Sequence, residues 1–142
     1  MTLPENLTTK LRHSFAKQSM MATFGAQLDE MPVGQVTLRA PILDGCQQQQ
    51  GFAHAALTFG LGDSAAGYSA LSVMPLEAEV LTSEMKIHLL APAQGDRLEA
   101  IGKVIKPGRR LVIVQAEVFA ISGDTRTQVA LMTGTMVPEL PK

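Results

Sequence analysis

One run of small residues constrains the fold more than any other segment of the chain: residues 53–70, AHAALTFGLGDSAAGYSA. The run is too long, and its side chains are too small, for an ordinary strand, so it predicts a helix. Gly60 and Gly62 each cost about 1 kcal/mol of helix propensity. That cost is reasonable only where neighbouring backbone must come close. We therefore expect a helix that is packed tightly on most of its faces.

Four segments after this helix alternate apolar and polar side chains as strands do, over residues 79–91, 96–106, 110–121 and 125–137. In the first, the alternation predicts two faces: Leu81, Met85, Ile87 and Leu89 on one, and Thr82, Glu84, Lys86 and His88 on the other. The links at 92–95, 107–109 and 122–124 each contain a glycine and suit antiparallel hairpins. These segments predict an antiparallel sheet.

The first 50 residues predict one helix and two shorter strands. Leu7, Leu11 and Phe15 recur at intervals of four, which indicates an amphipathic helix over residues 6–21. Runs at 22–28 and 34–40 are expected strands with a hairpin link between them. Residues 41–50 have no period and include four consecutive glutamines, so a loop is expected there.

The order of helix, two strands, small-residue helix and four strands predicts an α+β fold. The economical packing lays the small-residue helix on a six-stranded antiparallel sheet, with an additional N-terminal helix. A chain of 142 residues with 46% hydrophobic residues suits one domain, residues 1–142, with one core. Charged residues make up 18% of the chain, below the ~25% of typical soluble proteins, so we expect part of the surface to be covered in an oligomer.

Composition and charge argue against several classes of partner. The net charge is −1 and there is no Trp, so neither a basic field nor a stacking platform for nucleic acid is expected. No apolar run approaches the ~18 residues of a membrane span, and Glu5, Lys10, Arg12 and Lys17 interrupt any signal-peptide core. We expect a cytoplasmic protein. Cys46 is the one cysteine, which excludes an internal disulfide and a zinc site of several thiolates, and no cofactor is expected.

Three residues are candidates for chemistry. Asp63 lies within the apolar helix, where partial desolvation makes a carboxylate more basic; the alternative is a carboxylate at an exposed helix end. His54 lies in the first turn of the same helix, where a polar surface role is the common alternative. Gln48 adjoins three other glutamines, so a solvated loop residue is its alternative.

The spacing of two candidates argues for a site shared between chains. His54 and Asp63 are nine residues apart, so in a straight helix they lie ~13.5 Å apart along the axis and half a turn out of phase. They cannot cooperate within one chain. In a two-fold dimer, the His54 end of one helix can approach Asp63 of the other, which makes two equal composite sites.

The spacing of Gln48, Gly51, His54 and Asp63, followed by VLTSEMKI from residue 80 and by Pro92-Ala93, resembles the hotdog-fold acyl-CoA thioesterases, particularly the phenylacetic acid degradation type. The resemblance covers about residues 20–137. It implies an antiparallel sheet wrapped around a central helix. It also implies homodimers whose sheets join edge to edge, with dimers commonly paired into homotetramers.

The resemblance also implies roles for single residues. Asp63 matches the catalytic carboxylate, as nucleophile or general base, and Gln48 matches an amide that orients the carbonyl or the water. His54 opens the family's His-Gly-Gly signature, and the N–H of Ala55 matches the donor that polarises the carbonyl. Here Ala55 and Ala56 replace both glycines, which keeps the donor but adds methyl groups beside the expected thioester channel.

Binding roles are expected for four more residues. Gly51 belongs to the matching motif, and Thr82 matches a hydroxyl near the carboxylate in some members of the family. Arg109 and Arg110 lie with Lys106 on one turn. Such a turn is usually a solvated hairpin tip, and in a CoA enzyme it would hold the nucleotide phosphates.

Two classes of function follow. The favoured one, which the resemblance implies, is an acyl-CoA thioesterase. No Gly-x-Ser-x-Gly elbow, His-Glu-x-x-His motif or phosphate-binding glycine loop is present, so a serine-nucleophile enzyme is disfavoured. The alternative is another use of the hotdog fold, as a non-catalytic acyl-CoA-binding protein or an enoyl-CoA hydratase. A binding protein would fit the loss of both signature glycines. A hydratase would need Asp and His to converge within one chain, and the spacing argues against that.

Overall fold

A computed structural model describes all residues, 1–142. The chain begins with two short helices, α1 (Glu5–Ala16) and α2 (Ser19–Phe24), and its long helix is α3 (Ala55–Leu71). A 3-10 turn, η1 (Asp44–Cys46), lies before α3. The strands are β1 (Gln27–Leu28), β2 (Gln35–Pro41), β3 (Glu79–Leu89), β4 (Arg97–Pro107), β5 (Val112–Ser122) and β6 (Thr125–Glu139).

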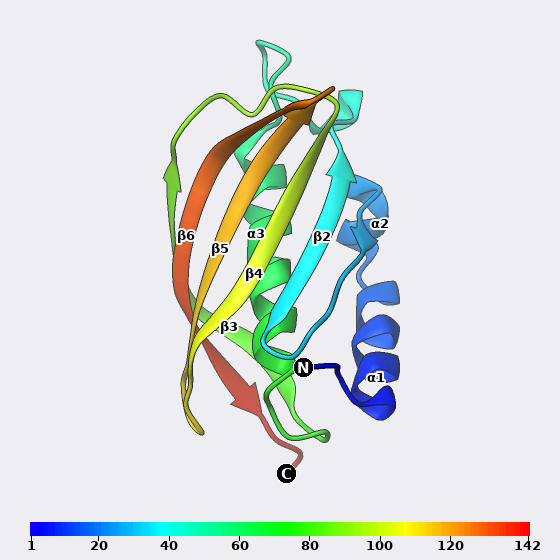
Figure 1. Cartoon of the computed structure of the whole chain (residues 1–142), viewed down its shortest axis with the longest axis vertical. Helices are drawn as coiled ribbons and strands as arrows, with labels where there is room; N and C mark the ends of the chain where they lie inside the picture. The colour runs from blue at the N-terminus through cyan, green and yellow to red at the C-terminus, as the bar shows by residue number, and fades with distance from the viewer.

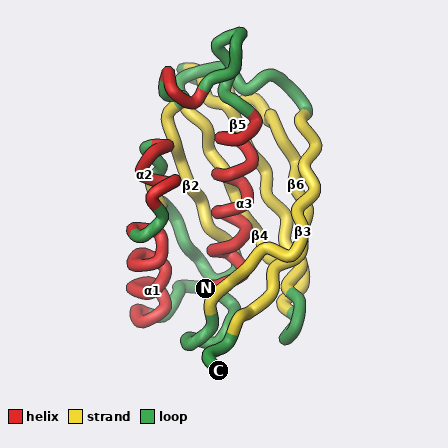
Figure 2. The backbone as a smooth tube through the Cα atoms, turned by 180° about the vertical axis from the view of Figure 1, so that it is seen from behind, coloured by secondary structure: helices red, strands yellow, loops and turns green.

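The six strands form one antiparallel sheet in the order β1-β2-β4-β5-β6-β3. The sheet curves around α3, which lies along its concave face, and α1 and α2 lie beside α3 near β2 (Figures 1 and 2). This confirms the predicted α+β architecture of a helix on a six-stranded sheet, the hotdog fold. None of the helices has the length and apolar character that a membrane span requires.

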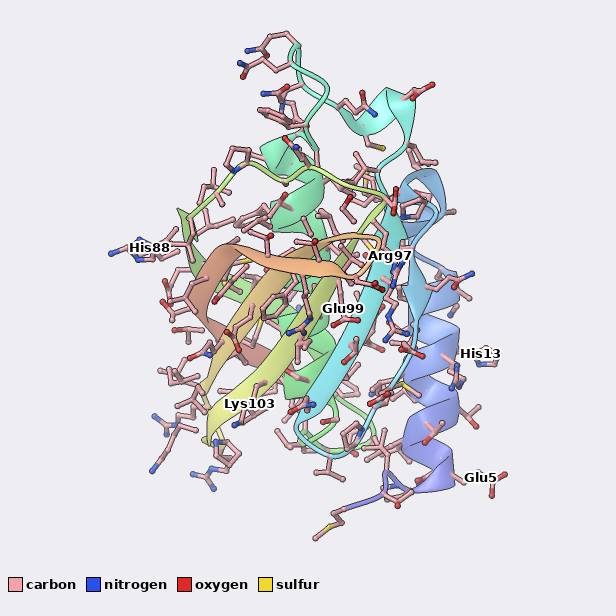
Figure 3. All side chains as sticks on the ribbon, turned by 45° about the horizontal axis from the view of Figure 1, so that its top comes forward. Glu5, His13, His88, Arg97, Glu99 and Lys103 are labelled. Carbon is pink, nitrogen blue, oxygen red and sulfur yellow. The ribbon has the colours of Figure 1, made fainter.

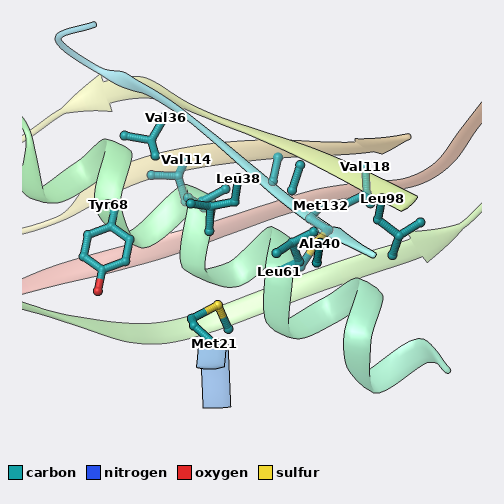
Figure 4. Packing of buried hydrophobic residues seen from close by; sticks show 14 of the residues in the cluster. Met21, Val36, Leu38, Ala40, Leu61, Tyr68, Leu98, Val114, Val118 and Met132 are labelled. Carbon is teal, nitrogen blue, oxygen red and sulfur yellow. The ribbon is translucent and has the colours of Figure 1, made fainter. Parts of the chain in front are cut away.

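The small residues of α3 allow the close approach that the sequence predicts. A Cβ added at Gly102 of β4 would lie 2.2 Å from the carbonyl of Ala65, so helix and sheet backbones meet there directly. Leu57, Leu61 and Ala65 are at most 1% exposed, and Figure 4 shows Leu61 among buried side chains of the strands, near Ala40 and Met132. Burial of this face against the sheet fixes which side of α3 remains available for chemistry.

The N-terminal region differs from the prediction. The expected helix over 6–21 is divided, because Gln18 adopts an extended conformation between α1 and α2. The amide Nε2 of Gln18 donates to the hydroxyl of Tyr68 at 2.7 Å, which draws the chain toward α3. The strand expected over 22–28 was wrong for its first half: Met21 and Phe24 are buried on one face of α2, and Gly25, with φ +67°, ends that helix.

The predicted faces of β3 were also partly wrong. The pairing of β3 with β6 shifts between Thr82 and Glu84, which is a β-bulge at Ser83. Thr82 pairs with buried Met136 and therefore faces α3, whereas Leu81 is 51% exposed. After the bulge Met85 and Ile87 pack against the core, so the predicted alternation holds there. The extra residue therefore reverses the predicted inward and outward faces of β3 in the part of the strand before the bulge.

The outer face of the sheet carries a cluster of ion pairs. Glu99 on β4 is 9% exposed (Figure 3), and it accepts hydrogen bonds from Arg39 Nε and Arg126 Nη2, both at 2.9 Å. Arg39 also pairs with Asp29. Although burial of Glu99 opposes its ionisation, the bonds from Arg126 and Arg39 hold its pKa below the usual range. This cluster ties β2, β4 and β6 together at a distance from the long helix's free face.

Candidate active site

Asp63 lies in the middle of α3 and is half-buried, so the alternative of an exposed helix end is wrong. Burial raises the pKa of its carboxyl group, and a hydrogen bond from Thr82 Oγ1 to Oδ1, at 2.8 Å, partly opposes this. The bulge at Ser83 is what turns Thr82 toward the helix. The pair lines a cleft of about 320 Å³ between α3, α1 and the first residues of β3. Asp63 is therefore a carboxylate of raised basicity that faces open space.

Gln48 lies in the loop before α3, and its side chain is held by that loop. Its Oε1 accepts hydrogen bonds from the backbone N–H groups of Gln50 and Phe52. The backbone of Gln48 also bonds to Phe52 and Gly51, and Gly51 makes this turn possible with φ +84°. The amide of Gln48 is thus fixed by contacts within five consecutive residues rather than by the core.

The start of α3 presents an unoccupied donor. His54 is the N-cap of the helix rather than a residue of its first turn, and its Nδ1 accepts from the N–H of Ala56 at 2.9 Å. The N–H of Ala55 is the first amide of the helix and donates no hydrogen bond within the chain. Ala55 is exposed. A free amide at the positive end of a helix dipole is suited to a carbonyl oxygen that gains negative charge.

Gln48 and Ala55 share a second cleft, of about 480 Å³, with residues 89–93 at the end of β3. Along α3, Ala55 and Asp63 are eight residues apart, or about 12 Å. The structure therefore brings together two pairs, Asp63 with Thr82 and Gln48 with Ala55, in separate clefts of the same chain.

The remaining predicted residues lie outside these clefts. Gly51 is at the tip of the Gln48 loop, and Arg109 and Arg110 are exposed in the turn between β4 and β5. Sequence reasoning missed Tyr68, which lines the Asp63 cleft and bonds to Gln18. Tyr68 is the one tyrosine in the chain and stands five residues after Asp63 in a run of small residues, a signal that could have identified it.

The sequence matches the model of one protein family, the thioesterase superfamily, over residues 50–127. The chain belongs to the thioesterase superfamily. The match includes His54, Asp63 and Thr82, so the half-buried carboxylate and the helix start lie within the region that defines the superfamily. This member of the superfamily is a thioester hydrolase.

Several solved structures resemble the chain over nearly its whole length. A thioesterase family protein from Silicibacter pomeroyi is 40% identical, with a TM-score of 0.93, over 95% of this chain and 99% of that one. The PaaI protein of the phenylacetic acid degradation operon of Escherichia coli is 19% identical, with a TM-score of 0.86, over 97% and 96%. The BH2602 protein of Bacillus halodurans, with CoA, is 22% identical, with a TM-score of 0.77, over 95% and 84%. None of the curated proteins matches the chain at a significant level.

Proposed function

We propose that the protein hydrolyses acyl-CoA thioesters to a free acid and CoA. The observation that carries this is Asp63, a half-buried carboxylate of raised pKa that faces a cleft in a thioester hydrolase. The Bacillus halodurans protein of the same fold, whose structure contains CoA, supports CoA as the thiol part of the substrate.

In the proposed mechanism, the thioester carbonyl oxygen accepts a hydrogen bond from the free N–H of Ala55. Negative charge develops on that oxygen as a nucleophile attacks, and the helix N-terminus stabilises it. Asp63 acts on the opposite side, either by removing a proton from the attacking water or by attacking the carbonyl carbon directly. In the second case, water then hydrolyses the acyl anhydride formed on Asp63 and releases the acid. Gln48 orients the carbonyl or the water. The CoA thiolate leaves without a strong acid, because a thiolate is a good leaving group.

This mechanism needs groups from both clefts, and the separation within one chain supports a site shared by two chains. The edge of β3 away from β6 has no partner strand, although the strand is eleven residues long. His88 projects outward at this edge (Figure 3), and Leu81 and Leu89 are 51% and 58% exposed. A long apolar edge is suited to pairing with the same strand of a second copy. We propose this homodimer, and its pairing into a homotetramer as the resemblance implies.

The charges on β3 favour one register for this pairing. Because Met85 and Ile87 face the core, Glu84 and Lys86 share the outer face. If Met85 lies opposite Met85 of the second copy, each Glu84 lies opposite a Lys86, and opposite charges meet across the two strands. The same register, with the bulge at Ser83, sets residues 79–82 opposite residues 87–90 of the copy. Residues 79–82 line the Asp63 cleft, and Leu89 and Leu90 line the Gln48 cleft, so this register brings the two clefts together.

Substrate-binding roles are proposed for two further places. Arg109 and Arg110 extend from the exposed β4–β5 turn and are suited to the phosphates of the CoA nucleotide. Gly51 keeps the Gln48 loop in its tight turn beside the start of α3.

Release of free CoA thiol from a panel of acyl-CoAs with short, medium, long and aromatic acyl groups tests the proposed function. We expect turnover of at least one class by the wild-type protein and its loss in Asp63→Asn. Thiol release from no acyl-CoA, or equal release by the two proteins, would contradict the proposal.

A further inference from the structure

The cleft beside Asp63 extends toward α1, where polar side chains line it. Its walls are the face of α3 after Asp63, residues 79–82 of β3, and Ser14 and Gln18 from the α1–α2 segment, with Met136 at the side. The end near Asp63 is where the thioester reacts in the proposed mechanism. The other end therefore decides which groups attached to that thioester fit.

Gly67 keeps this cleft open. It lies one helical turn after Asp63, on the same side of α3. A Cβ added at Gly67 would meet only the Cε atom of Met136, at 4.0 Å, whereas a Cβ added at Gly62 would lie 2.2 Å from Met132 Sδ. Close packing thus explains the glycine at 62 but not the one at 67. A glycine inside a helix destabilises that helix relative to alanine. Gly67 therefore lowers the stability of α3, although no close contact requires a glycine at this position.

The far end of the cleft offers hydrogen-bonding atoms. The hydroxyl of Tyr68, a residue 3% exposed, accepts from Gln18 Nε2 at 2.7 Å and lies 3.1 Å from Ser14 Oγ. The Oε1 atom of Gln18 has no hydrogen-bond partner within the chain. Tyr68 lies five positions after Asp63, roughly 7.5 Å along the helix axis. A plain hydrocarbon chain that reached this end would displace water from polar atoms and leave them unpaired.

We propose that Gly67 and Gln18 determine the acyl specificity of the enzyme. Gly67 leaves room for an acyl group that runs from Asp63 toward α1. Gln18, supported by Tyr68, selects acyl groups that carry a hydroxyl or a similar hydrogen-bonding group at the far end over plain alkyl groups of equal length. This inference rests on the proposed hydrolysis of acyl-CoA.

The experiment compares kcat/KM for acetyl-CoA, a medium-chain alkanoyl-CoA and the same chain with a terminal hydroxyl group. In wild type, the hydroxylated chain is expected to be preferred over the plain one by about tenfold or more, since sites built for a hydrogen bond reject analogues that lack it. Gly67→Ala should lower the ratio of the hydroxylated chain to acetyl-CoA by about tenfold or more, the effect of one added methyl group in a pocket. Its Tm should rise because alanine favours the helix.

Two further variants separate the parts of the inference. Gln18→Met keeps the length of the side chain and should abolish the preference for the hydroxyl group. Gly45→Ala is the matched control, because a Cβ there meets nothing within 4 Å and Gly45 does not line the cleft. Its ratios should equal those of wild type. Unchanged ratios in Gly67→Ala, or an unchanged hydroxyl preference in Gln18→Met, would overturn the inference.

The proposed function can fail separately. If wild type hydrolyses no acyl-CoA in the panel, the same three ligands are titrated into wild type and Gly67→Ala by calorimetry. Tighter binding of the hydroxylated chain to wild type, weakened in Gly67→Ala, would support the acyl cleft without hydrolysis. Equal binding to both proteins, or no binding to either, would overturn it.

Discussion

The two clefts of the chain are built in different ways. The Asp63 cleft is held by tertiary packing, since its walls come from α1, α3 and β3, and its carboxyl group is half-buried. The Gln48 cleft depends on local hydrogen bonds, since Gln48 is fixed by Gln50 and Phe52 and the donor of Ala55 is at the surface. A base of raised pKa therefore needs burial, whereas a backbone donor needs only an exposed helix start.

The largest effect is expected from Asp63→Asn, which should lower kcat by about 100-fold or more while acyl-CoA still binds. Burial raises the folded-state pKa of Asp63, so its ionised form opposes folding above that pKa. Asparagine removes this charge, and the Tm of the variant at neutral pH should equal or exceed that of wild type. Steady-state kinetics with a melting curve check this, and near-normal turnover by the folded variant would remove Asp63 from the mechanism.

Gln48→Ala is expected to lower kcat by about tenfold, because an orienting amide affects alignment of the reacting groups. Its Tm should change little, since Gln48 is bonded only within its own loop. Gln49→Ala is the matched control, being the exposed neighbour that does not line the cleft. Equal kinetics for the two variants would assign the role to another glutamine.

Lys86→Glu tests the register proposed for the joined clefts. In the proposed dimer, each of the two Glu84 side chains would then lie opposite another negative charge. Two such cross-strand pairs, at about 0.2–1 kcal/mol each, should raise the dimer Kd about 2- to 30-fold. The exchanged pair, Glu84→Lys with Lys86→Glu, should restore the dimer. Sedimentation at several concentrations measures this, and a single variant that dimerises like wild type would exclude the register.

Thr82→Val should have a modest effect on rate and a distinct effect on pH dependence. Loss of a hydrogen bond of about 0.5–1.5 kcal/mol lowers kcat about 2- to 12-fold. Since the Thr82 hydroxyl lowers the pKa of Asp63, its removal raises that pKa further. Asp63 must be ionised to act. On acidification, the variant should therefore lose activity at a higher pH than wild type does. A pH–rate profile with an unmoved acid limb would show that Thr82 does not act through Asp63.

Most of the sheet and the long helix could be predicted from the sequence, because their signals are local. The small-residue helix expected over 53–70 is α3, Ala55–Leu71, and the last four strands lie within a few residues of their expected bounds. Asp63 was identified for the same reason, as a carboxylate within an apolar helix. The distance between His54 and Asp63 followed from helix geometry alone.

Features that depend on distant residues could not be predicted. The division of the first helix depends on Gln18 bonding to Tyr68, 50 residues further along the chain. The bulge at Ser83 interrupts an alternation that looks regular, and it is what brings Thr82 to Asp63. The position of α1 beside the Asp63 cleft follows from the first of these. Alternation and helix period report only on neighbours in sequence.

Mixing two impaired variants tests the shared site most directly. Asp63→Asn and Gln48→Ala subunits are combined, and exchange is verified by mass or by tagged pull-down. In each mixed dimer one site carries both substitutions and the other carries neither, so up to about a quarter of wild-type activity should return when half the dimers are mixed. If each site lay within one chain, every site would keep one substitution, and verified exchange without recovered hydrolysis would contradict the account.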